Sequence, residues 1–200
     1  MPELETLLLE RACQGDFEAF AQLQELLEPS LRRFIRRLIG SHDSEDDIVQ
    51  TVFISLYRNM HKISPPENLR PYVFRMVRNR CYDELRAAGK WKSVSMDDDA
   101  VEVYVSFNAS ASEPQPEDVS HWLLLQLEVR EAMEKLPELQ RQTLILFAEE
   151  EMSYAEIAEA METSIGTVKS RLHHAKKTLR GLLKPETLQA IESSLGVDEE

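Results

Sequence analysis

The sequence contains little cysteine, no long apolar run and no recognisable export signal. Its two cysteines, Cys13 and Cys81, stand 68 positions apart, a spacing that matches no zinc or redox motif. We therefore expect two buried free thiols and no disulfide. No run of about 18 apolar residues occurs, so no insertion into a membrane is expected. The opening MPELETLLLERAC lacks the basic start and long apolar core of a secretion signal, and this predicts a cytoplasmic location.

Basic residues are also scarce, because 23 Lys and Arg face 36 Asp and Glu, for a net charge of −13. The excess acid lies mainly in two segments. Residues 91–120 carry one base and seven acids, and residues 186–200 carry five acids and no base. Residues 1–90 and 121–185 are each close to neutral. An acidic average argues against nucleic-acid binding, but a local basic stripe is the more informative signal.

The apolar residues recur with a helical period almost throughout, which predicts an all-α fold. The expected helices of the first half run from Leu4 to near Gly15, over residues 17–39 (as one helix or as two joined at Pro29), from a cap at Ser44 to Met60, and from Pro71 to Gly89. Residues 61–70 contain two prolines and are expected to form a loop. The expected helices of the second half begin at His121, at Pro137, at Ser153 and at Ser164.

The composition of the chain predicts two small helical domains joined by an extended linker. We place the domains at residues 1–92 and 121–184, the acidic linker at 93–120 and an acidic tail at 185–200. The segment VEVYVSF, within the linker, has the propensity of a strand. A lone strand would have no partner, so an extended linker is the preferred interpretation.

The segment SIGTVKSRLHHAKKTLR (164–180) contains five Lys or Arg, two His and no acidic residue. It follows SYAEIAEAM, in which Ser153 and Glu156 predict an S-x-x-E capping box. Two such helices with a short turn between them have the outline of a helix-turn-helix. At 100° per residue, one face is apolar and the opposite face carries small and basic residues. The apolar stripe consists of Val168, Leu172, Ala175 and Leu179.

The absence of carboxylates suits a helix that lies in the major groove between two rows of phosphates. A solvated basic surface is the alternative. The adjacent His173 and His174 point about 100° apart and cannot share a metal ion, so no metal or cofactor is expected.

With these motifs identified, the chain resembles the extracytoplasmic-function (ECF) sigma factors of bacterial RNA polymerase. Its second half is similar to their region 4 in LPE-x-QR, SYAEIAE and GTVKSRLHHAKK. Its first half resembles region 2 in ACQGDFEAFAQL, SEDDIVQTVFISLYRN and RPYVFRMVRNRCYDELR. The resemblance implies a non-enzymatic factor that binds the clamp and flap of core RNA polymerase, recognises and opens promoter DNA, and is held inactive by an anti-sigma factor.

The resemblance also implies three sets of site residues. The polymerase-binding residues are Asp47, Gln50 and Phe53, unless their helix is simply buried within its own domain. Contacts to the −10 element are assigned to Arg75, Arg78, Asn79, Tyr82, Asp83 and Arg86, most of which share one helical face. Contacts to the −35 element are assigned to Gly166, Thr167, Lys169, Ser170, Arg171, His173, His174 and Lys177.

Several alternatives remain open from the sequence. The polar face of the fourth helix could be ordinary solvated surface. The acidic linker would either occupy a channel built for nucleic acid or act as a simple tether. The whole chain could instead be a stand-alone helix-turn-helix regulator, or an interaction module without a role at DNA.

Overall fold

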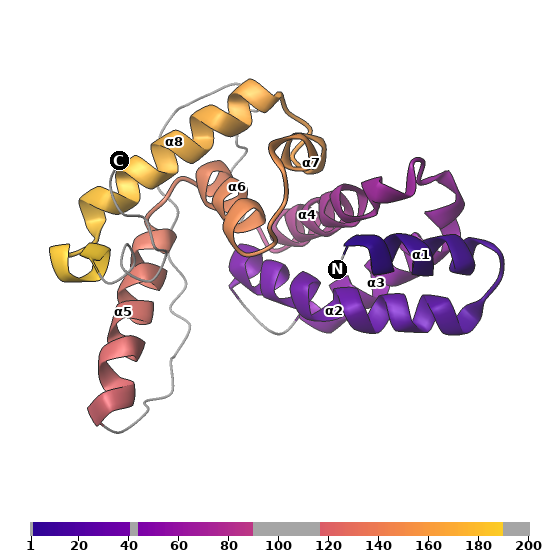
Figure 1. The fold of residues 1–200 in the computed structure, drawn as a ribbon, viewed down its shortest axis with the longest axis horizontal. Helices are drawn as coiled ribbons and strands as arrows, with labels where there is room; N and C mark the ends of the chain where they lie inside the picture. The colour runs from indigo at the N-terminus through magenta and orange to yellow at the C-terminus, as the bar shows by residue number, and fades with distance from the viewer. Residues whose placement is uncertain (1, 41–43, 90–116, 190–200) are drawn as a thin grey trace.

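The computed structural model describes residues 2–40, 44–89 and 117–189, and side chains from Leu124 onward in the last range. Every regular element in these ranges is helical, as the sequence predicts (Figure 1). The elements are α1 (Pro2–Cys13), α2 (Phe17–Ile39), α3 (Glu45–Asn59), the short 3-10 helices η1 (Met60–Lys62) and η2 (Pro66–Asn68), α4 (Leu69–Ala87), α5 (Glu117–Glu134), α6 (Glu138–Ala148), α7 (Tyr154–Ala160) and α8 (Ile165–Leu182).

Helices α1 to α4 form the first unit. Its core is the apolar stripe of α2 packed against those of α1, α3 and α4. Phe34 and Phe74 meet in this core edge to face, with ring centroids 5.2 Å apart. Helix α2 is continuous through Pro29, because the buried stripe of Leu27 and Leu31 spans the proline on the opposite face.

The turn between α1 and α2 is held by Asp16. One carboxylate oxygen accepts the Ala19 N–H at 3.0 Å and so caps α2, as expected for an aspartate at this position. The other oxygen accepts two hydrogen bonds from Arg11, at 2.7 and 3.0 Å. The Ala19 N–H and then Arg11 stabilise the carboxylate, and they hold the pKa of Asp16 below its usual range. Gly15 makes the turn possible with a φ of 93°.

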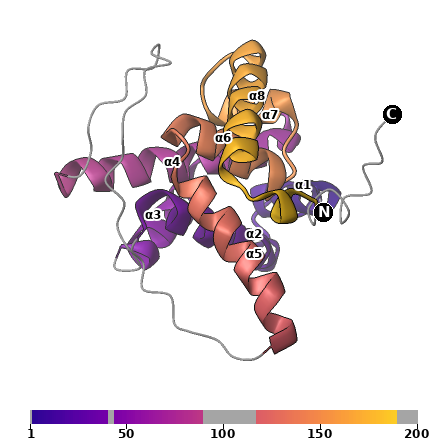
Figure 2. The ribbon, with the colours of Figure 1, turned by 90° about the vertical axis from the view of Figure 1, so that its left-hand side faces the viewer.

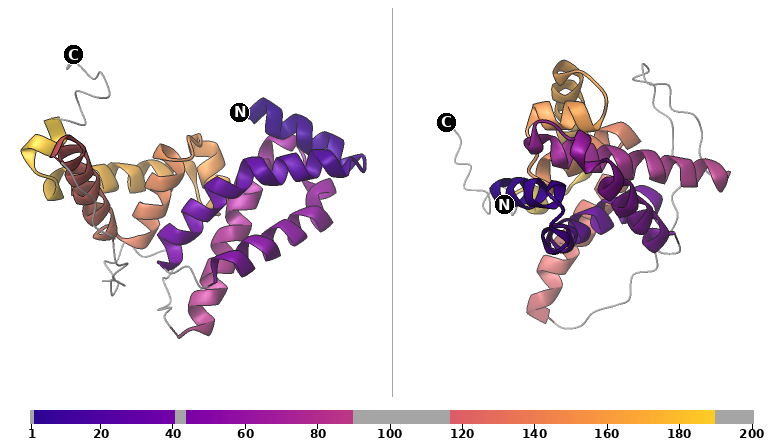
Figure 3. Two further views of the ribbon diagram at one scale, coloured as in Figure 1. Left: turned by 90° about the horizontal axis from the view of Figure 1, so that it is seen from below. Right: turned by 90° about the vertical axis from the view of Figure 1, so that its right-hand side faces the viewer.

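Helices α5 to α8 form the second unit. Helices α6 and α7 both pack against α8. Helix α5 packs against α8 and contacts the turn that follows α8. There Glu128 accepts hydrogen bonds from the Lys184 N–H at 2.6 Å and from the Thr187 hydroxyl at 3.0 Å. Figure 3 shows α5 at the end of the molecule opposite α1.

The structure corrects several local predictions. Ser44 occupies the cap position of α3, but its hydroxyl donates to Glu84 at 2.9 Å and leaves the helix end uncapped. The expected loop 61–70 contains turns of 3-10 helix, and α4 already begins at Leu69. Cys81 is buried, but Cys13 is exposed, since it lies on the outer face of α1. Most of the predicted linker and most of the tail lie outside the described residues, but residues 117–120 belong to α5, which begins four residues before the predicted start at His121.

The two units pack directly against each other. Helix α4 packs against α7, and it lies between α1–α3 on one side and α6–α8 on the other (Figure 1). Consequently α4 has one face in the core of its own unit and another against the second unit.

Replacing Phe34 by alanine tests the core of the first unit. Phe34 is fully buried, so we expect Phe34→Ala to lower the free energy of unfolding by about 3–5 kcal/mol. Urea unfolding followed by circular dichroism measures the change. The control is Phe17→Ala, because Phe17 is 72% exposed and its loss should cost less than about 1 kcal/mol. Equal losses for both variants would contradict this description of the core.

Candidate nucleic-acid interface

Helix α8 is oriented by its apolar stripe. Val168, Leu172 and Ala175 are buried where α8 packs on α6 and α7, and Leu179 is half-buried. Because these residues face inward, the opposite side of α8 must face solvent. Figure 2 shows α8 along the outer edge of the second unit.

The structure brings most of the predicted −35 residues together on this outer side. The exposed ones are Gly166, Lys169, Ser170, His173, His174 and Lys177. Thr167 and Arg171 are half-buried at the edge of the face. A Cβ added to Gly166 would meet only Ser164 Oγ, at 3.6 Å. The protein's own packing therefore does not require glycine there, whereas close approach of a ligand backbone would favour it.

Capping interactions fix both helices of the motif. Ser153 and Glu156 form the predicted capping box at the start of α7, with bonds of 2.8 and 3.3 Å. Ser164 accepts the Thr167 N–H at 3.0 Å and caps α8. Between them Glu162 has a φ of 52°, a left-handed conformation that costs a non-glycine residue about 1 kcal/mol or more.

Two lysines of α8 lie over aromatic rings, which the sequence pattern did not reveal. Lys169 Nζ is 5.9 Å from the centroid of Tyr154, and Lys176 Nζ is 5.1 Å from that of Phe147. The two rings are themselves 5.6 Å apart. Cation–π contacts of this kind restrict a lysine side chain without neutralising its charge.

The predicted −10 residues on α4 are divided by their surroundings. Asn79, Asp83 and Arg86 are exposed, Arg75 and Tyr82 are half-buried, and Arg78 is buried. Arg86 is paired with Asp83 at 2.8 Å. The outer part of this face is therefore accessible, whereas the inner part is covered.

The second unit provides the cover. Arg78 donates to Glu162 at 2.7 Å and contacts the sulfur of Met161 at 3.8 Å. The Tyr82 hydroxyl exchanges hydrogen bonds of 2.9 and 3.0 Å with the amide of Gln142. Gln142 also donates to the buried carboxylate of Glu138 at 2.6 Å.

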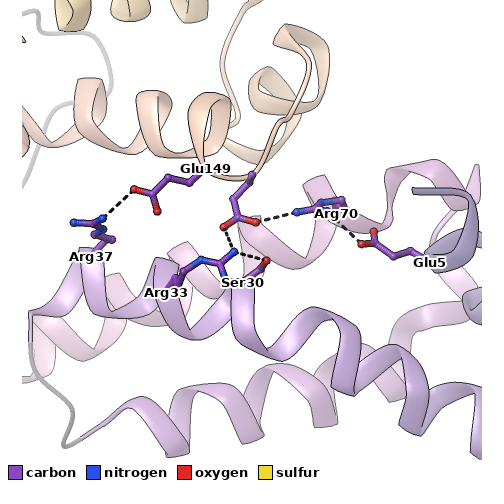
Figure 4. Close-up of polar contacts among 7 residues, drawn as sticks. Glu5, Ser30, Arg33, Arg37, Arg70 and Glu149 are labelled. Carbon is purple, nitrogen blue, oxygen red and sulfur yellow. Dashed lines mark hydrogen bonds and ion pairs between the residues drawn. The ribbon is translucent and has the colours of Figure 1, made fainter. Parts of the chain in front are cut away.

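Further ion pairs join the units beside this contact (Figure 4). Arg37 donates to Glu149 at 3.1 Å, and Arg33 donates to Glu150 at 3.3 Å. Arg70 donates to the other oxygen of Glu150 at 2.9 Å. Sequence reasoning missed this cluster, because nothing in the sequence indicates that positions over 75 residues apart are neighbours.

The predicted polymerase-binding residues all lie on helix α3 of the first unit. Asp47 and Gln50 are exposed on α3, whereas Phe53 is only 5% exposed. Gln50 and Phe53 line a groove of about 650 Å³ between α2 and α3. The groove also includes Phe20 and Tyr57, which meet edge to face at 5.0 Å. Phe53 therefore contributes to the floor of a groove and not to a protruding contact.

Burial shifts the pKa of two groups in and beside the contact between the units. It raises the pKa of Glu138, against the opposing effects of Arg141 and Gln142, and it raises the pKa of the Cys81 thiol to about 12. No group of His, Cys, Asp and Glu among the described residues is arranged to hold a metal ion. None of the described helices combines the length and apolar character that a membrane crossing requires.

Comparisons with known proteins agree with this geometry. The family model for Sigma-70 region 2 matches residues 23–90, and that for Sigma-70 region 4 matches residues 126–179. The chain is 34% identical over 155 residues to the ECF RNA polymerase sigma factor EcfG of Rhodopseudomonas palustris (78% of this chain, 80% of the relative). It is 30% identical over 185 residues to the ECF RNA polymerase sigma-E factor of Escherichia coli (90% and 94%).

A solved structure shares the fold. The sigma factor RpoE of Bartonella quintana, crystallised with the anti-sigma factor NepR, superposes with a TM-score of 0.61 at 28% identity, over 83% of this chain and 97% of that one. The order of the two matched regions, the helix-turn-helix and the similarity to full-length relatives lead to one conclusion. This chain belongs to the ECF sigma factors, the alternative sigma factors of transcription initiation.

Proposed function

We propose that this chain brings core RNA polymerase to promoter DNA through one DNA-binding surface on each unit. The observation that carries the proposal is the exposed outer face of α8, in a segment (residues 163–184) that contains six Lys or Arg and no acid. Because the apolar stripe on the opposite side of α8 is buried, this face can only point to solvent. A short basic helix held this way fits the major groove.

The roles of the two units follow from their surfaces. The α8 residues would bind the −35 element, with Lys169, Ser170 and His173 closest to the base edges. The α4 face, with Asn79, Tyr82 and its arginines, would bind the melted −10 element, because arginine contacts phosphate while Asn and Tyr supply base-edge bonds and stacking. Asp47, Gln50 and the α2–α3 groove would dock on the polymerase clamp.

The remaining assignments follow from this role. We place the chemistry of RNA synthesis in the polymerase and none in this chain, and we place the chain in the cytoplasm with the polymerase. The similarity to RpoE crystallised with NepR supports an anti-sigma factor as a further partner. The domain limits of 1–92 and 121–184, with an acidic linker between them, are part of the same proposal.

Transcription in a purified system tests the proposal. Core polymerase and this chain would be combined with promoter fragments from the genome that encodes the chain, and transcripts would be sequenced. We expect defined start sites only when both proteins are present. Tight DNA binding by a dimer without polymerase would favour a stand-alone regulator. Neither transcription nor DNA binding would favour an interaction module.

Lys169→Ala tests the α8 surface. We expect the holoenzyme to lose about 1–3 kcal/mol of affinity for its −35 element if Lys169 binds a base, and less if it binds a phosphate. Competition binding with promoter fragments measures the loss. Lys184→Ala is the control, because Lys184 lies beyond α8 and is 75% exposed. Unchanged binding and transcription would remove Lys169 from the site.

Asn79→Ala tests the α4 surface. Asn79 is exposed and accepts a long hydrogen bond of 3.4 Å from Arg78, so its loss should not unfold the unit. We expect promoter opening to slow by about 5- to 50-fold while polymerase binding stays intact. Permanganate reactivity of unpaired thymines follows the opening. A variant that loses its helical circular dichroism would show that Asn79 is structural instead.

A further inference from the structure

Four arginines of the first unit are paired with carboxylates of the second unit. Arg33 and Arg37 come from α2, and Arg70 and Arg78 from α4. Their partners are Glu149, Glu150 and Glu162, which lie just after α6 and just after α7. In all four pairs the first unit supplies the positive charge and the second unit the negative charge.

The neighbouring arginines of α2 behave differently. Arg32 pairs with Glu28, Glu45 and Asp46, and Arg36 pairs with Glu45, all within the first unit. The sequence RRFIRR therefore divides into two arginines that keep their partners when the units separate and two that lose them. Separation would leave Arg33 and Arg37 without their carboxylate partners.

The carboxylate of Glu150 is held as an anionic ligand would be. Its two oxygens accept from Arg33 at 3.3 Å and from Arg70 at 2.9 Å, and its side chain is 1% exposed (Figure 4). Arg33 also donates to Ser30 Oγ at 2.9 Å, which restricts its position. Two guanidinium groups that converge on one buried anion match phosphate as well as carboxylate.

The carboxylates satisfy this site only in part. The Nε atoms of Arg70 and Arg78 are buried and have no hydrogen-bond partner. A buried donor without a partner weakens the contact that encloses it. Glu5 also binds Arg70, at 3.2 Å, and it belongs to the first unit. Since Glu5 would stay when the units part, Arg33 and Arg37 carry most of the charge that becomes available.

We propose that Arg33, Arg37 and Arg70 form a second nucleic-acid site that binds phosphates of single-stranded DNA, and that Glu149 and Glu150 occupy it in the free chain. This inference rests on the proposed function, since the site adjoins the α4 surface assigned to the −10 element. The same packing covers Arg78 and Tyr82. Separation of the units thus uncovers the phosphate site and the inner part of the α4 face together.

Neutralising the two carboxylates is the first arm of the test. Glu149→Gln/Glu150→Gln should separate the units and leave the arginines free. We expect a larger radius of gyration by small-angle X-ray scattering. We also expect about 5- to 20-fold tighter binding of a fluorescein-labelled oligothymidylate at low salt. The plot of log K against log[salt] should steepen by about 1.5–2, as two or three additional phosphate contacts require.

Neutralising the arginines is the second arm. Arg33→Gln/Arg37→Gln breaks two of the three ion pairs that the first arm removes and leaves Arg70 with Glu150, so the contact between the units should weaken here too. Two of the three arginines of the site are lost, however, so oligothymidylate should gain clearly less affinity than in the carboxylate variant, and only what the uncovered α4 face adds. Equal gains in both variants would show that the arginines serve only to close the units, and this would overturn the proposal. An absence of gain in the carboxylate variant would overturn it as well.

A matched control separates the site from the general effect of charge. Glu151→Gln/Glu159→Gln removes the same charge from the same unit, and neither residue forms an ion pair with the part of the chain that the structure describes. This variant should keep its radius of gyration and gain less than about twofold in affinity. If the first double variant unfolds, Glu149→Gln alone applies, because Glu149 is 29% exposed and its neutralisation should still give a measurable gain.

Failure of the inference is distinguishable from failure of the proposed function. Polymerase-dependent transcription by the unmodified chain tests the function alone. Transcription without the expected difference between the carboxylate and arginine variants would overturn only the second site. The expected difference without any transcription would leave the site in place and overturn the assignment to promoter initiation.

Discussion

Helix α4 has two adjacent faces that are covered by different units. Phe74, Val77 and Cys81 are buried in the first unit, while Arg78 and Tyr82 contact the second unit. Because a helix is rigid on the scale of these contacts, the core that positions α4 also positions its polar face. Every relation between the two units depends on this one helix and on the ion pairs around it.

The interface is polar, and this has consequences for its strength. Its charged groups are partly desolvated, and the cost of desolvation offsets much of their attraction. Arg33 and Arg37 remain 48% and 37% exposed, so salt screens their pairs. Such ion pairs can hold two small domains together, and another anion or a larger protein surface can still displace the carboxylates from the arginines. A dry apolar interface would not exchange in this way.

The second unit keeps its proposed DNA-binding surface open regardless of this contact. The outer face of α8 lies opposite the stripe that packs on α6 and α7, and the residues that contact the first unit come from other elements. The two proposed DNA surfaces therefore differ in the free chain: the α8 face is open, whereas the inner α4 face is covered. The exposed part of α4, including Asn79, remains accessible in both cases.

Local signals in the sequence determined the helices, the capping box at Ser153, the orientation of α8 and the division into two matched regions, because periodicity and capping depend on residues within a few positions of each other. They also placed the proposed site residues on common helical faces. Only the tertiary structure decided that Arg78 is buried, that Phe53 lies in a groove floor, that Ser44 binds Glu84 and that Cys13 is exposed. It alone paired Arg33 and Arg37 with Glu150 and Glu149. These outcomes depend on contacts between residues far apart in the chain, for which a single sequence carries no local pattern.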